Sequence, residues 1–369
     1  MNAKADEIVT AIGAISGTSM DGIDVALIRS DGRQRLEAGP GATYPYPADV
    51  AAQLRAVIAD PDATRRPLAE LEAAVTDAHV AAIENLIAEF AVDRRAVSLV
   101  GMHGQTVLHR PREHFTRQLC DGARAAAALS LDVVCDFRSA DVAAGGEGAP
   151  LVPLYHAAMC AALARPLAVL NWGGVGNVTF LGPGDEILAF DTGPANALLD
   201  DFVRRRRGLA HDEDGRLAAS GRIDNEVVAA LMRDPYFERP APKSLDRNHF
   251  HHVALDAVAA LDDADGAATL AAFTVESTAA AARQFSQAPQ RWLVCGGGRR
   301  NATLMQALAK RLATPVDPIE SIGFDGDVVE AQCFGYLALR SRQGLPLSLP
   351  TTTGVPRPMA GGRLWPARR

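Results

Sequence analysis

A glycine-centred turn between two apolar runs decides the fold of this chain: Ile12-Gly13-Ala14-Ile15-Ser16-Gly17-Thr18-Ser19-Met20-Asp21-Gly22-Ile23-Asp24-Val25-Ala26-Leu27-Ile28. After the turn, Val25 and Leu27 follow the period of two that is typical of a half-buried strand. The familiar phosphate loops run instead from a strand into a helix. The stretch therefore predicts a tight β-hairpin.

The second half of the chain contains a similar stretch, Leu167-Ala168-Val169-Leu170-Asn171-Trp172-Gly173-Gly174-Val175-Gly176-Asn177-Val178-Thr179-Phe180-Leu181. Here Val178 and Phe180 show the same strand period after the glycines. A hairpin tip of small residues can hold phosphate, because its backbone N–H groups converge and no side chain blocks the approach. Two such hairpins predict a duplicated fold that grips a nucleotide between its halves.

Length and composition restrict the class of protein. The chain has 369 residues, enough for two ordinary domains, and 48% of them are hydrophobic. The net charge of −7 disfavours nucleic acid or an anionic membrane as the main partner. No apolar run reaches membrane-spanning length, and the N-terminus lacks a secretory signal pattern, so we expect a cytoplasmic protein. The five scattered cysteines are typical of reduced thiols and not of a zinc site.

Strands alternate with helices in both halves, which predicts an α/β layered fold. The loop-like segment 143–150 predicts a domain boundary, with an N-terminal lobe at 1–142, a C-terminal lobe at 143–350 and a tail at 351–369 that packs back. A further strand is expected near Tyr44. Other strands are expected at 96–102 and 132–138, and helices at 64–90 with Thr64 as cap, 154–164, 267–285, 301–312 and 327–341.

The first turn carries hydroxyl and carboxylate groups at Thr18, Ser19 and Asp21. This pattern predicts contacts to phosphate, with Asp21 or Asp24 near a bound Mg²⁺. An ordinary turn is an equally good interpretation, because Asp-Gly is a common hairpin signal. The second hairpin and the triple glycine 296–298 favour the nucleotide, since a structural turn seldom needs three consecutive glycines.

Two acidic residues, Asp191 and Glu330, are candidates for roles in catalysis. Asp191 ends an expected strand, just before Thr192-Gly193-Pro194. It can be a general base at the sheet edge, where open α/β sheets place their chemistry, or a helix N-cap. Glu330 lies beside an apolar stripe on the last helix. It can be solvated, or it can orient a hydroxyl or a water.

The segment His103-Gly104-Gln105-Thr106 follows an expected strand and offers donors and acceptors to a polar ligand. A structural histidine is about as good an interpretation. His249, His251 and His252 match no strong metal-ligand spacing. The arginines at 204–207 are typical of a solvated helix C-terminus, with Gly208 as its cap.

Taken together, these residues resemble the anhydro-N-acetylmuramic acid kinase family of the sugar kinase, Hsp70 and actin superfamily. The resemblance spans nearly the whole chain. It rests on the order and number of the following segments: 16–24, 103–107, 136–138, 148–153, 190–194, 296–298 and 352–356.

The resemblance implies a two-lobed actin-like ATPase (ribonuclease H-like) fold with nucleotide in the interlobe cleft. It implies Asp191 as catalytic base, with Glu330 helping to hold the sugar and the water. His103, Gln105 and Thr106 are expected to bind the sugar, and Asp21 to hold Mg²⁺. The expected ATP-binding residues are Gly17, Thr18, Ser19, Met20, Asp21, Gly22, Ile23, Asp24, Gly173, Gly174, Gly296, Gly297, Gly298 and Asn301.

The implied reaction opens the anhydro bridge of the sugar with water and transfers the γ-phosphate of ATP to the 6-oxygen, giving N-acetylmuramic acid 6-phosphate. A homodimer is implied as well. The sequence departs from the family at Trp172, Gly176, Ala195, Val329 and 242–247. Two alternatives stay open: another sugar or carboxylate kinase of the superfamily, or an actin- or Hsp70-like ATP switch.

Overall fold

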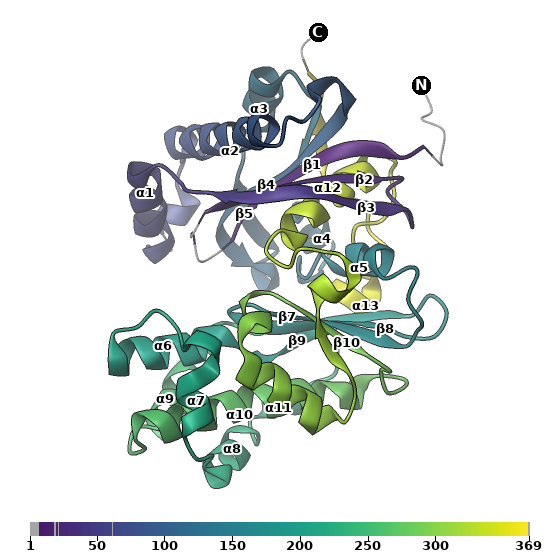
Figure 1. Cartoon of the computed structure of the whole chain (residues 1–369). Helices are drawn as coiled ribbons and strands as arrows, with labels where there is room; N and C mark the ends of the chain where they lie inside the picture. The colour runs from purple at the N-terminus through teal and green to yellow at the C-terminus, as the bar shows by residue number, and fades with distance from the viewer. Residues whose placement is uncertain (1–6, 18–19, 21, 61, 368–369) are drawn as a thin grey trace. The chain divides into compact units, whose positions relative to one another are not determined.

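The computed structural model describes residues 7–17, 20, 22–60 and 62–367. The chain divides into two compact units, residues 1–162 with 327–369, and residues 163–326. Residues 143–162 and the C-terminal segment from 327 thus belong to the first unit, whereas the expected boundaries put 143–162 and 327–350 in the C-terminal lobe. The C-terminal segment belongs to the first unit because its long helix, residues 329–342, lies against the first two strands of the chain (Figure 1).

The first unit is built on a seven-stranded mixed sheet in the order β12-β6-β4-β1-β2-β3, with β5 paired to β4. Strands β1 to β3 form an antiparallel meander, and β4 and β6 continue parallel to β1. The strands are β1 (Val9–Ser16), β2 (Ile23–Ser30), β3 (Leu36–Tyr44), β4 (Val97–Arg110), β5 (Phe115–Leu119), β6 (Val133–Cys135) and β12 (Arg363–Trp365).

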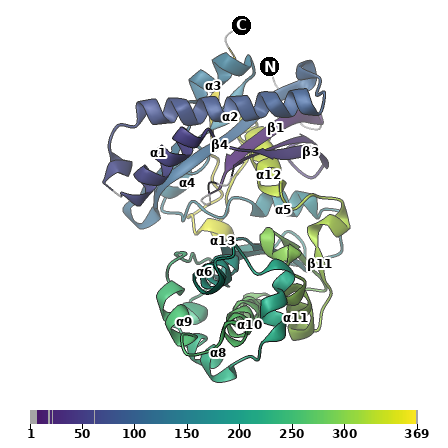
Figure 2. The ribbon, with the colours of Figure 1, turned by 60° about the vertical axis from the view of Figure 1, so that its left-hand side comes forward.

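Helices cover both faces of this sheet (Figures 1 and 2). Its helices are α1 (Ala48–Ala59), α2 (Ala69–Glu89), α3 (Gly122–Leu129), α4 (Ser139–Ala143), α5 (Pro153–Met159), α12 (Val329–Arg342) and α13 (Pro350–Thr353). Ile12 and Ala14 pack in the core with α1, α2 and α3. Between them Gly13 points the other way, where a Cβ would lie 1.8 Å from the carbonyl oxygen of Ala331. Glycine at this position therefore lets α12 lie directly on β1.

The second unit has a five-stranded sheet in the order β11-β10-β7-β8-β9. Its strands are β7 (Leu167–Trp172), β8 (Val175–Leu181), β9 (Ile187–Pro194), β10 (Trp292–Cys295) and β11 (Val316–Pro318). Its helices are α6 (Asn196–Arg207), α7 (Arg216–Ser220), α8 (Asn225–Leu231), α9 (His251–Ala257), α10 (Asp263–Ala281) and α11 (Ala302–Leu312). Most of α10 is buried, and Figure 2 shows it end-on among α6, α8, α9 and α11.

The two sheets repeat one topology, which confirms the predicted duplication. In each, an antiparallel meander of three strands is followed by two strands parallel to the first one: β3-β2-β1-β4-β6 and β9-β8-β7-β10-β11. Both predicted hairpins, β1–β2 and β7–β8, begin these meanders. The α/β class is therefore confirmed.

Some local predictions need correction. Thr64 is not the cap of a long helix, because α2 begins at Ala69, after Pro67. The strand expected at 96–102 continues to Arg110 with a register shift beside β5, since the polar residues after Met102 still pair. Gly208 does end α6 in a left-handed conformation, with φ of 69°. Among the described residues, no helix is long and apolar enough to cross a bilayer.

Candidate functional site

The first predicted phosphate turn connects β1 to β2 and is anchored by Gln105 of β4. The Ser16 hydroxyl donates a 2.6 Å hydrogen bond to Gln105 Oε1, and Gln105 Nε2 donates to the Gly17 carbonyl at 3.3 Å. Gln105 is fully buried. The structure thus places Gln105 behind the turn, as a support for its first residues. Thr18, Ser19 and Asp21 lie outside the described residues.

The far side of the same turn is fixed against β3. A Cβ on Gly22 would lie 2.5 Å from Thr43 Cγ2, and the Thr43 hydroxyl donates a 2.6 Å hydrogen bond to Asp24 Oδ1. Ile23 is buried beside them, whereas Gly17 and Met20 are partly exposed. Within the described part of the chain, no group of three or more His, Cys, Asp or Glu side chains could hold a metal.

His103 is a buried member of a polar cluster at the middle of β4. Its Nδ1 lies 3.0 Å from the Gly104 carbonyl, so Nδ1 carries the proton, and Nε2 accepts a 2.9 Å hydrogen bond from Arg138 Nε. Burial and the positive charge of Arg138 lower the pKa of His103 well below 6.5. Both ring nitrogens are therefore occupied, and Thr106, two residues after Gly104, is the more exposed of these side chains.

Glu330 lies in the first turn of α12 and is exposed. One helical turn further on, the ring of Phe334 packs on His103 at 4.6 Å between centroids. Burial lowers the pKa of the Arg138 guanidinium, and the negative charge of Glu330 opposes that shift. The structure therefore brings together two predicted site residues, His103 and Glu330, around an arginine that the sequence analysis did not single out. Arg138 entered the sequence analysis only as part of the segment 136–138, one of the segments on which the family resemblance rests.

Asp191 lies within β9 and is half-buried. The Leu245 amide donates a 2.8 Å hydrogen bond to Asp191 Oδ2, and the Tyr236 hydroxyl donates to the Asp191 carbonyl at 2.5 Å. The Asp191 amide donates in turn to the Lys243 carbonyl at 2.9 Å. The interpretation of Asp191 as a helix N-cap is wrong, because α6 begins only at Asn196.

The second glycine turn packs against the start of α6. The Asn196 amide donates to the Gly173 carbonyl at 3.0 Å, and Asn196 Nδ2 donates to the Trp172 carbonyl at 2.7 Å. No motif in the sequence analysis indicated Asn196. A Cβ on Gly174 would meet nothing closer than 3.5 Å, so this glycine is not required by packing.

The triple glycine lies beside the same turn. Gly296 has φ of 73°, and a Cβ there would lie 2.8 Å from the Trp172 carbonyl. A Cβ on Gly298 would lie 2.5 Å from Trp172 Cβ, whereas Gly297 is exposed. Asn301 caps α11 by accepting a 3.0 Å hydrogen bond from the Leu304 amide. The structure thus brings the two predicted nucleotide segments of the second unit together.

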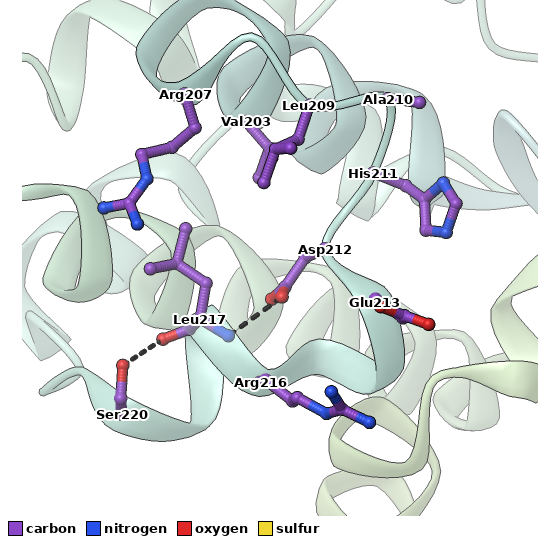
Figure 3. A pocket seen from close by; sticks show the side chains of 10 residues that line it. All are labelled: Val203, Arg207, Leu209, Ala210, His211, Asp212, Glu213, Arg216, Leu217 and Ser220. Carbon is purple, nitrogen blue, oxygen red and sulfur yellow. Dashed lines mark hydrogen bonds between the residues drawn. The ribbon is translucent and has the colours of Figure 1, made fainter.

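A pocket of about 630 Å³ lies between the end of α6 and α7 (Figure 3). Its lining combines Val203, Leu209 and Leu217 with charged side chains such as Arg207 and Arg216. The segment that closes it is tied to α11, because the Thr303 hydroxyl donates to the Gly215 carbonyl at 3.0 Å. The pocket therefore lies near the first turn of α11, and no motif in the sequence indicated it.

A duplicated α/β fold with glycine turns at its strand ends and an oriented carboxylate on β9 has the features of an ATP-dependent phosphotransferase. The family model described as anhydro-N-acetylmuramic acid kinase matches residues 9–367. The chain therefore belongs to the anhydro-N-acetylmuramic acid kinase family, and it is a kinase.

Relatives with about half of their residues identical match nearly the whole chain. The anhydro-N-acetylmuramic acid kinase of Rhodospirillum rubrum is 53% identical over 99% of this chain and 96% of its own length. That of Acidiphilium cryptum is 51% identical over 96% of this chain and 97% of its own length.

Likeness to solved structures is more distant. A ROK family glucokinase from Streptomyces griseus, solved with glucose and AMPPNP, has 15% identity and a TM-score of 0.40, covering 92% of this chain and 100% of that one. The activator of 2-hydroxyisocaproyl-CoA dehydratase from Clostridium difficile, with bound ADPNP, has 10% identity and a TM-score of 0.47, covering 91% of this chain and 96% of that one.

Proposed function

We propose that the protein uses ATP to convert 1,6-anhydro-N-acetylmuramic acid and water into N-acetylmuramic acid 6-phosphate. The observation that carries the proposal is Asp191, a half-buried carboxylate that a backbone N–H holds in one orientation on β9. A carboxylate fixed in this way suits a general base that must meet a water in one geometry. Relatives at about half identity are named anhydro-N-acetylmuramic acid kinase, which supports the anhydro sugar as the phosphoryl acceptor.

The proposed chemistry couples two bond changes. Asp191 takes a proton from a water, the water oxygen bonds to the anomeric carbon, and the bond from that carbon to the bridging oxygen breaks, as in inverting glycoside hydrolysis. The released 6-oxygen bonds to the γ-phosphorus of ATP, and ADP leaves. The phosphoryl group captures the leaving oxygen, so no separate acid is needed. Glu330 is proposed to hold the sugar and the water, and His103, Gln105 and Thr106 to form or support the sugar site.

Two sets of glycines are proposed to hold ATP. In the first unit, residues 17–24 would present backbone N–H groups to the phosphates. In the second unit, Gly173, Gly174, Gly296, Gly297, Gly298 and Asn301 would form the adenosine side. The space around Gly174 supports this assignment, because no packing requirement accounts for this glycine, and Gly297 beside it is exposed.

Mg²⁺ is proposed to accompany ATP. It usually needs only one or two protein carboxylates, since waters and phosphate oxygens complete its shell. Asp21 is the proposed ligand, and the metal would neutralise charge on the transferred phosphoryl group.

The decisive experiment follows the oxygen atoms. Purified protein with Mg-ATP and the anhydro sugar, in ¹⁸O-labelled water, is expected to give a 6-phosphate labelled at the anomeric hydroxyl and unlabelled at the phosphate ester. Mass spectrometry with fragmentation locates the label. The control acceptors are N-acetylmuramic acid and glucose. Label in the phosphate, or preference for an unbridged sugar, would refute the coupled reaction.

We also propose that the enzyme works in the cytoplasm, as a homodimer. All five cysteines are free thiols in the structure, which agrees with a reducing compartment. Light scattering during size-exclusion chromatography measures the mass of the particle, and a single-chain mass across the working concentration range would exclude the dimer.

A further inference from the structure

We propose that Arg138 is a positioning residue of this kinase, which fixes His103 and orients the carboxylate of Glu330 in the first unit. The inference rests on the proposed function, since it assigns these two residues to the sugar. Arg138 precedes α4 and follows Phe137, whose ring packs on Phe334 at 5.2 Å. Four observations support the assignment.

The first is the bond to His103. Arg138 Nε donates to His103 Nε2, and a guanidinium can only donate, so it holds this nitrogen as an acceptor. The opposite ring nitrogen donates to the Gly104 carbonyl. The imidazole is thereby fixed in one tautomer and one ring orientation, as second partners do for functional histidines.

The second is the clamp on the loop at 145–150. Arg138 Nη1 donates a 2.7 Å hydrogen bond to the Gly148 carbonyl, while Asp141 Oδ1 accepts a 2.7 Å bond from the Gly148 amide. Both polar groups of one residue are thus held by side chains from one short segment. The Thr353 hydroxyl donates to Asp141 Oδ2 at 2.6 Å and braces the clamp from the C-terminal segment. Arg138 is therefore rigidly placed.

The third is the placement of Glu330 on α12. Glu330 and Phe334 are four residues apart, so they share one face of the helix, and Phe334 lies on His103. Glu330 therefore lies on the face of α12 that packs on His103, the residue to which Arg138 donates. Its negative charge opposes the lowering of the Arg138 pKa by burial. The positive charge of Arg138 thus acts on the carboxylate of an exposed residue at the start of α12.

The fourth is the set of N–H groups that Arg138 keeps after these two bonds. Arg138 Nη2 makes no hydrogen bond to any residue that the structure describes, although Nε and Nη1 are both used. A half-buried guanidinium that keeps further N–H groups after these two bonds suits a carboxylate better than a surface arginine does, since its orientation is already fixed. Removing it leaves His103 Nε2 and the Gly148 carbonyl without this donor, and it removes a positive charge that acts on Glu330.

The test compares Arg138→Lys and Arg138→Ala with Arg55→Ala, an exposed arginine on α1. For Arg138→Ala we expect kcat/KM for the anhydro sugar to fall about 100-fold, the scale of a misplaced catalytic group, while KM for ATP stays within about threefold. Arg138→Lys keeps the positive charge but lacks the planar guanidinium with its several N–H donors. Its kcat/KM should therefore lie between those of the wild-type protein and Arg138→Ala. Millimolar methylguanidine should restore activity to Arg138→Ala and leave Arg55→Ala unchanged.

Three outcomes would overturn the inference. One is equal loss toward sugar and ATP. Another is failure of methylguanidine to restore a folded Arg138→Ala, with folding checked by circular dichroism. The third is full activity in Arg138→Lys, which would show that charge alone suffices; this variant also provides the test if Arg138→Ala does not fold. A wild-type protein that leaves the anhydro sugar unchanged would instead refute the proposed function.

Discussion

The backbone amide of Leu245 points at the side chain of Asp191 and donates a 2.8 Å hydrogen bond to its Oδ2 atom. Leu245 belongs to the segment 242–247, in which a departure from the family pattern was expected from the resemblance. The contact uses the main chain, and every residue except proline can supply it. The departure therefore leaves the orientation of Asp191 intact.

Replacing Asp191 by Asn should abolish turnover, with a loss of about 1,000-fold or more in kcat, because an amide cannot accept the proton of the attacking water. The amide oxygen can still accept from Leu245, so folding and ATP affinity should persist. Asp185→Asn, in the exposed turn between β8 and β9, is the matched control. Phosphate transfer to the anhydro sugar measures activity, and calorimetry measures ATP binding. Substantial turnover in Asp191→Asn would remove Asp191 from the role of base.

Glu330→Gln should raise KM for the sugar and lower kcat/KM by about 10- to 100-fold, since it removes the negative charge that is proposed to hold the sugar and that acts on Arg138. Because Glu330 is exposed, the free energy of unfolding should change by less than about 0.5 kcal/mol. Glu70→Gln, in the exposed first turn of α2, should leave both quantities unchanged. Steady-state kinetics and urea unfolding give the two numbers. Unchanged sugar kinetics would mean that Glu330 is a solvated surface acid.

Gly296→Ala should weaken ATP binding and destabilise the second unit. Its Cβ would lie 2.3 Å from Asn171 Oδ1 and 2.8 Å from the Trp172 carbonyl, at a φ of 73°. Gly184→Ala is the matched control, because Gly184 also has positive φ but has no atom within 4 Å of the added Cβ. The control should lose only the conformational term of about 1 kcal/mol. Equal losses in the two variants would show that crowding at Gly296 is relieved.

Lys243 should make stability rise with pH. Burial lowers its pKa from 10.5 to about 8, so between these values the unfolded chain binds a proton that the folded chain has released. The free energy of unfolding should therefore increase across this window, by about 2 kcal/mol. Lys243→Met should lack this increase, whereas Lys310→Met, in the exposed end of α11, should retain it. Urea unfolding at about pH 7.5 and about pH 10 tests the difference. An identical rise in Lys243→Met would contradict the assignment.

The architecture could be predicted from the sequence because the patterns that indicate strands, turns and helix ends involve residues close together in the chain. The alternation of Val25, Leu27, Val178 and Phe180 and the glycines between the apolar runs identified both hairpins, and α6 ends at the predicted Gly208. The predicted start of α2 was wrong. Thr64 has a side chain that can cap a helix, but α2 begins only at Ala69, after Pro67.

The sequence by itself determined the duplicated strand pattern, the two glycine turns and the candidacy of Asp191, because periodicity and turn chemistry depend on residues close together in the chain. Only the tertiary structure decided which side chains meet. Arg138, His103 and Phe334 come from distant segments, and nothing local to any one of them indicates the other two. The same holds for α12, which joins the first unit because Gly13 and Gly101 leave room for its backbone on the sheet.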